Sequence, residues 1–148
     1  MGAGAYSVGR RVAVMDAHTE KLISLLNLLR DKTRAISGAD GPKCYGFVFE
    51  KNGVPKEISV PYKNIREGCD KNTQTNIPLT WQNDVKVKSL QTNGVGDGEK
   101  ITILFAPPHG TIVADENDNS FTIVLQYKDR TRTIDINESS GRIEKVIN

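Results

Sequence analysis

The sequence has no apolar run of about 18 residues or more, so no part of it is predicted to span a membrane as a helix. Met1 to Arg11 contain no apolar core followed by a cleavage site, which argues against a secretory signal there. Neither sign of charge is in large surplus, because 20 basic and 18 acidic side chains leave a net charge of only +2. This balance gives no electrostatic reason to expect nucleic acid or an anionic membrane surface as the main partner. The 148 residues suit one domain with a single core.

Residues that bind metals or form covalent intermediates are also scarce. The sequence has two cysteines, Cys44 and Cys69, and two histidines, His18 and His109. A zinc site needs about four converging ligands, and these four residues are too scattered to favour one. The cysteines form no Cys-x-x-Cys motif. Taken alone, they leave two interpretations open, which are two buried free thiols or one disulfide in an exported domain.

The first third of the sequence has the pattern of one long helix. Steps of three and four residues place its apolar and threonine side chains on one stripe. Gly38 and Gly41-Pro42 are typical of the end of a helix. We predict a helix over about 5–37, roughly 45–50 Å long, so that part of it projects from the domain or packs against another chain. The stripe contains Val8, Val12, Met15, Thr19, Leu22, Leu26, Leu29, Thr33 and Ile36, and Leu25 widens it.

After Pro42 the period changes to two, which is typical of strands. Pro61 indicates that the strand around residues 58–62 lies at the edge of a sheet. The nearly continuous apolar run at 121–127 favours a central strand. Because the helix comes first and only short strands follow it, we predict an α+β fold with antiparallel pairing. The expected architecture is one domain over 1–148, in which a long amphipathic N-terminal helix packs on a β-sheet or β-sandwich head at 43–148. Its packing residues are Leu22, Leu25, Leu26, Leu29 and Ile36. Further strands are expected at 44–49, 77–81, 85–88, 101–105, 111–113, 130–136 and 142–147.

No motif in the sequence indicates catalysis or a cofactor. The glycines of 94–98 are not followed by Gly-Lys-Ser/Thr, so they do not form a phosphate-binding loop. The segment 115–119 is rich in oxygen ligands, but an EF-hand loop starting at Asp115 would have Ser120 and Gln126 where a glycine and a glutamate are needed. We therefore predict no catalytic residue, no metal site, no cofactor and no enzymatic activity.

Three stretches together carry a resemblance to a known family. Leu25–Ser37 is a leucine-rich helix end with arginines, closed by Ala-Ile. Ile103–Gly110 approximates a strand of the form apolar-x-Phe-x-Pro-x-Gly, with one extra residue before the glycine. Tyr127–Ile136 is a hairpin with arginines, followed by Gly141-Arg142-Ile143. In this order, the chain resembles the soluble part of a type IV pilin or of a type II secretion pseudopilin, the H-type minor pseudopilin in particular.

The resemblance implies a structural filament subunit whose partners are other pilin or pseudopilin subunits. It also implies a basic leader and an apolar anchor for the inner membrane; neither lies in this sequence, so we expect them in a preceding segment. The head would then lie on the extracytoplasmic side or in an extracellular filament. This location favours a disulfide between Cys44 and Cys69. The stripe formed by Val8, Val12 and Met15 would pack against neighbouring subunits as a filament seam.

An alternative interpretation is a recognition module attached to such a filament. Its β head would bind DNA, a surface ligand or calcium through Lys86, Lys88 and the segment 115–119. The alternation of Lys86 and Lys88 with Val85 and Val87 is also the ordinary pattern of a solvated strand face. The resemblance covers secretion, pilus and DNA-uptake systems alike.

Overall fold

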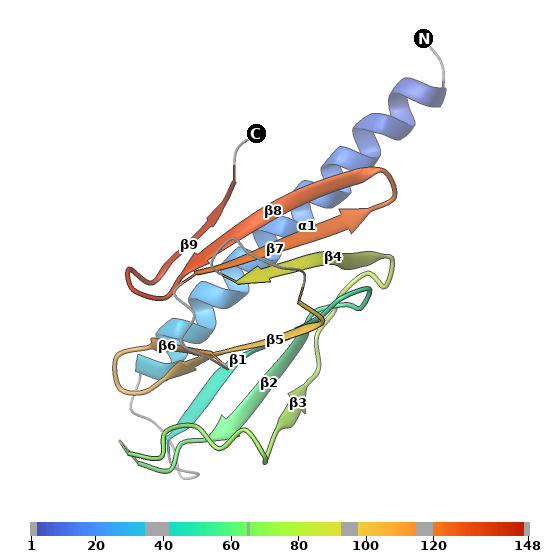
Figure 1. Cartoon of the computed structure of the whole chain (residues 1–148). Coiled ribbons are helices and arrows are strands. Elements are labelled where there is room, and N and C mark those ends of the chain that lie inside the picture. Colours follow the sequence, from blue (N-terminus) through green and yellow to red (C-terminus); the bar gives the residue numbers. More distant parts are fainter. Residues whose placement is uncertain (1–2, 35–41, 65, 93–97, 115–119, 147–148) are drawn as a thin grey trace.

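The long N-terminal helix, α1, is the first element of the fold. The structure is a computed structural model that describes residues 3–34, 42–64, 66–92, 98–114 and 120–146. Ala3–Arg34 form α1, a helix of 32 residues whose last turn carries Lys32 and Arg34, where cations suit the helix dipole. Figure 1 shows its N-terminal turns extending past the sheets, while the rest of the helix lies behind them. Residues 35–37, the predicted end of the helix, lie outside the described residues.

The remaining elements form two antiparallel sheets (Figure 1). The five-stranded sheet has the order β3-β2-β1-β5-β6, and the four-stranded sheet has the order β4-β7-β8-β9. The predicted α+β class, with an N-terminal helix packed on antiparallel sheets, is therefore confirmed. The strands are β1 Lys43–Glu50, β2 Lys56–Pro61, β3 Thr75–Ile77, β4 Val85–Thr92, β5 Lys100–Ala106, β6 Thr111–Ala114, β7 Ser120–Tyr127, β8 Arg130–Asn137 and β9 Arg142–Lys145.

Two strand predictions need correction, whereas the central position of β7 is confirmed by its pairing with β4 and β8. The strand β2 is not at an edge, because it pairs with β1 on one side and β3 on the other. The short β3 pairs only with Glu57–Ser59, so the missing N–H of Pro61 falls beyond it. The expected strand at 77–81 is also wrong, because β3 ends at Ile77 and leaves Leu79 and Trp81 outside the ladder.

The β1–β2 turn joins the two sheets. The backbone N–H of Asn52 donates to the Val87 carbonyl at 2.8 Å, and the Val87 N–H donates to the Gly53 carbonyl at 2.8 Å. Asn52 has φ 66°, a left-handed conformation that asparagine tolerates better than most residues. These bonds occupy part of the outer edge of β4, so the two sheets are held together at this end.

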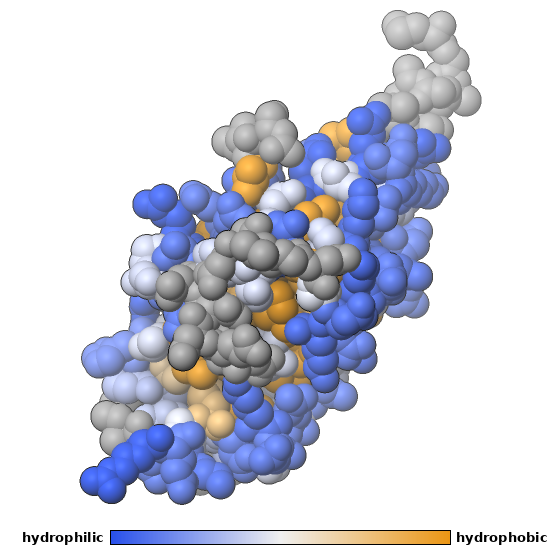
Figure 2. All heavy atoms as spheres, viewed as in Figure 1, coloured by the Kyte–Doolittle hydropathy of each residue, from blue (hydrophilic) through white to orange (hydrophobic). Residues whose placement is uncertain are grey.

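A single core lies between α1 and both sheets. Leu22 and Leu26 of the helix are completely buried, as are Phe47 of the five-stranded sheet and Ile123 of the four-stranded sheet. On the face drawn in Figure 2, which is opposite α1, hydrophilic residues predominate and apolar residues show mainly in the middle of the molecule. The helix thus completes the core by covering the inner faces of both sheets.

Candidate functional site: the helix and its attachment to the sheets

The packing face of α1 agrees with the predicted stripe at the residues that the structure describes. Leu22, Leu26 and Leu29 are 0–3% exposed, and Leu25 is half-buried against the same core. Thr19 is also buried, because its hydroxyl donates to the Met15 carbonyl at 2.8 Å within the helix. Ile36, the remaining predicted packing residue, lies outside the described residues.

The predicted filament seam is wrong at Met15. Its side chain is 0% exposed and belongs to the core between helix and sheets, so it already has partners within the molecule. Val12 is half-buried, and the Val8 side chain lies outside the described residues. The exposed side of this part of the helix instead carries Arg10, Ala13 and Ala17.

Among the residues that the structure describes, three ion pairs attach α1 to the four-stranded sheet. Arg11 Nη1 lies 3.3 Å from Asp129 Oδ1, and Arg132 Nε lies 2.7 Å from Asp16 Oδ1. One turn further along, Glu20 Oε1 lies 3.1 Å from Lys145 Nζ. Surface pairs of this kind contribute about 0–1 kcal/mol each, so their main effect is to fix the rotation of the helix on the sheet.

A second attachment lies at the C-terminal end of α1, where two arginines hold a turn from each sheet. The Arg30 guanidinium donates to the Gly141 carbonyl in the β8–β9 turn, and Arg34 Nε donates to the His109 carbonyl in the β5–β6 turn at 3.0 Å. Gly110 has φ +69°, and a Cβ there would lie 2.7 Å from Arg30 Cγ. The β5–β6 turn can therefore approach the helix closely only with glycine at this position. Gly110 and Gly141, which belong to two of the motifs behind the family resemblance, thus both lie against Arg30 of the third.

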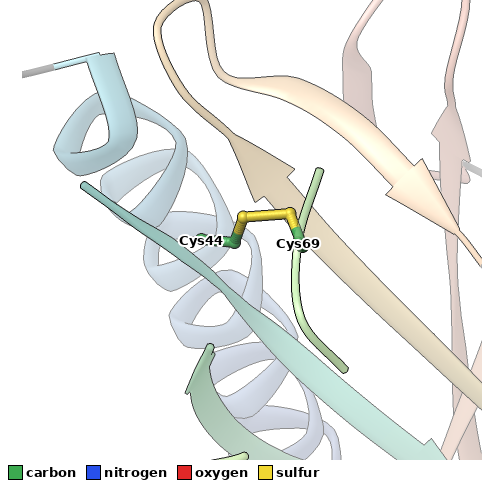
Figure 3. Close-up of a disulfide and its surroundings, with 2 residues drawn as sticks. All are labelled: Cys44 and Cys69. Atoms are coloured by element: carbon green, nitrogen blue, oxygen red, sulfur yellow. A yellow bond between two sulfur atoms is a disulfide. The ribbon is translucent and has the colours of Figure 1, made fainter. Parts of the chain in front are cut away.

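The predicted disulfide between Cys44 and Cys69 is confirmed. Figure 3 shows the bond running from β1 to the segment after β2, and the two Cα atoms are 6.1 Å apart. Cys44 lies in a second, smaller core on the face of the five-stranded sheet away from α1. Cys69 packs against this core beside Tyr62, and the two residues form an isolated β-bridge. The disulfide thereby fixes the segment after β2 over the outer face of the sheet.

Two carboxyl groups beside the helix have shifted pKa values. Burial raises the pKa of Glu57 on β2 above its ordinary value, and the nearby Lys32 ammonium offsets only part of this effect. The pKa of Asp129 is lowered, since its own backbone N–H and the Arg11 guanidinium favour the carboxylate more than desolvation disfavours it.

The described residues contain no group of three or more His, Cys, Asp or Glu side chains that could hold a metal ion. His18 Nδ1 lies 2.9 Å from the Val14 carbonyl, and its ring meets Trp81 edge-on. Trp81 Nε1 donates to the Val85 carbonyl, so the indole is a packing residue rather than an open stacking platform.

The segments 94–98 and 115–119 include residues outside the described ranges. The absence of enzymatic activity stays a prediction.

Lys86 and Lys88 are exposed on β4, while Val85 and Val87, which alternate with them, are buried. This alternation matches a solvated strand face. Binding of DNA or of a surface ligand by these lysines stays a prediction.

Sequence reasoning missed the ion pairs and the double attachment through Arg30 and Arg34. Each joins residues more than 70 positions apart, so no local spacing reports them. The available signals were the i, i+4 spacing of the two arginines and the glycine in each turn.

No protein-family model, curated protein or solved structure matches this chain. Within the described residues, no helix combines the length and the apolar character needed to cross a membrane.

Proposed function

We propose that this protein is a structural subunit, a minor pilin or pseudopilin, of a type IV pilus or type II secretion-like filament. The observation that carries the proposal is that one part of α1 is packed under the sheets and the other part projects from them. From Met15 to Thr33 one face of the helix is buried under the two sheets, whereas the N-terminal turns extend beyond them (Figure 1). A helix that is fixed at one end and projects at the other is suited to joining neighbouring subunits.

The attachments described above support this role. A projecting helix transmits force to its head only if the two parts move together, and α1 is fixed by a buried stripe, three ion pairs and two arginines. The disulfide supports a head that folds in an oxidising compartment, since such bonds persist mainly outside the cytoplasm. In this proposal the inner-membrane anchor lies in a segment that precedes the sequence, and the partners are other pilin-like subunits.

The proposal is tested first in the gene. We expect the reading frame upstream of Met1 to encode a basic leader, a glycine at its end, and about twenty apolar residues, the length that spans a bilayer. Fractionation of the native cells should place the protein in the membrane, with the head digested by protease added from the extracytoplasmic side. An in-frame stop codon directly upstream, together with recovery of the protein from the cytosol, would contradict the proposal.

A further inference from the structure

Asn137 has a sequence context that no other asparagine of the chain shares. Of eleven asparagines, it alone is followed at the second position by serine or threonine, in Asn137-Glu138-Ser139, and no proline lies between them. This is the acceptor pattern for N-linked glycans.

The structure places this asparagine at an exposed turn. Asn137 is the last residue of β8, and the β8–β9 turn begins directly after it. Its side-chain oxygen accepts hydrogen bonds from the Ser140 N–H at 2.9 Å and from the Ser140 hydroxyl at 3.2 Å. Asn137 and Ser139 are both exposed. The carboxamide is therefore oriented by its oxygen at the surface, where a substituent on its nitrogen would meet no core residue.

A polar depression of about 380 Å³ lies beside Asn137, next to the exposed side chains of β8. Carboxylates of Asp135 and Glu144 and the guanidinium of Arg142 line it, together with hydroxyl groups. The Thr122 hydroxyl donates to Asp135 Oδ1 at 2.9 Å.

The chemistry of the depression suits a sugar. Carboxylates accept hydrogen bonds from sugar hydroxyls, and guanidinium groups donate to sugar oxygens. On β8 the neighbouring Ile134 and Ile136 point into the core and are completely buried, whereas Asp135 and Asn137 face the depression. A sugar attached to Asn137 could thus lie along the sheet without disturbing the packing beneath it.

We propose that Asn137 is an N-glycosylation site whose first sugar rests in this depression. The donor is a glycan linked to a lipid pyrophosphate. The Asn137 amide nitrogen forms a bond to the anomeric carbon, the bond from that carbon to the pyrophosphate oxygen breaks, and the amide proton passes to a base of the transferase. Because β8 is paired on both sides, transfer precedes the completion of the sheet. The inference rests on the extracytoplasmic head of the proposed function.

The test is mass spectrometry of the protein purified from its native cell envelope. Trypsin cleavage after Arg132 and Arg142 releases the peptide Thr133–Arg142, which contains Asn137. We expect this peptide to carry an added mass that fragments as a hexosamine-type sugar on Asn137. Ser139→Ala should abolish the added mass and Ser139→Thr should retain it. Neither variant disturbs the fold, since the structure gives the exposed Ser139 side chain no hydrogen bond.

The same preparation separates the two proposals. An unmodified peptide from protein that is protease-accessible outside the cytoplasm and has Cys44 oxidised would overturn the glycosylation site and leave the filament role standing. Protein found in the cytosol with both cysteines reduced would overturn both. An added mass that persists in the Ser139→Ala variant would place the modification on another residue and would also overturn the proposal.

Discussion

A single glycine in the middle of β1 sets the distance between β1 and its neighbour β5 in the five-stranded sheet. Gly46 lies opposite Leu104 of β5, and a Cβ at this position would lie 1.9 Å from the Ile103 carbonyl oxygen. No rotation of a side chain can relieve this contact, because the obstacle is backbone. The strand pair β1–β5 can therefore form in its present geometry only with glycine at position 46.

We predict that Gly46→Ala destabilises the protein by about 3 kcal/mol or more, at the upper end of overpacking effects. Gly9→Ala is the matched control. Gly9 is helical, and a Cβ there has no neighbour within 4 Å, so alanine should stabilise by about 0.5–1 kcal/mol. Urea denaturation of both variants measures the effect. A Gly46→Ala protein as stable as the wild type would show that β1 and β5 do not approach as described.

The raised pKa of Glu57 leads to a prediction about how the stability of the protein depends on pH. Since burial raises its native pKa above the ordinary value of 4.5, the native state binds the Glu57 proton more tightly than the unfolded state does. The stability that comes from this proton is complete below pH 4.5 and is lost as pH rises through the native pKa. The neutral variant Glu57→Gln should therefore be more stable than the wild type at pH 7 and equal to it near pH 3. Denaturation midpoints at both values check this, and a less stable variant at pH 7 would mean that the Lys32 interaction dominates.

At the scale of elements, α1 has buried and exposed leucines only two residues apart. Leu26 is 0% exposed, whereas Leu28 is 60% exposed. Leu26→Ala should cost about 2–5 kcal/mol through lost burial and a cavity. Leu28→Ala should change the free energy of unfolding by less than about 0.5 kcal/mol, because it touches no packed feature. Equal effects from the two substitutions would show that α1 is rotated from the position described.

The elements differ in how far the sequence predicted them. The helix was predictable because its stripe of leucines repeats at steps of three and four, and β7 because its run from Phe121 to Tyr127 is almost continuously apolar or β-branched. The position of β2 was not predictable. Pro61 suggested an edge, but the neighbouring β3 is too short to reach it, and the length of a partner strand is a tertiary property. The burial of Met15 depended similarly on how far the sheets extend along the helix, which no local pattern reports.

The stability of the whole molecule depends on a disulfide that the cysteine pattern alone did not predict. The Cys44–Cys69 disulfide closes a separation of 25 residues and covers the second core. In the chain-entropy view, closing a loop of this length stabilises by roughly 3–4 kcal/mol. Reduction with dithiothreitol should lower the urea midpoint accordingly. The Cys44→Ala/Cys69→Ala double variant should have a low midpoint with or without reductant. A midpoint that reduction leaves unchanged would contradict this role.

The central claim, that α1 joins this protein to neighbouring filament subunits, is tested most directly by cross-linking in the native cells. Single cysteines at the exposed Ala13 and Ala17 should form adducts with pilin-like subunits, identified by mass spectrometry, and these adducts should disappear when the filament's assembly ATPase is inactivated. A cysteine at the buried Met15 is the control and should give none. Adducts that persist without assembly, or none from either exposed position in a correctly folded and exported protein, would contradict the filament role.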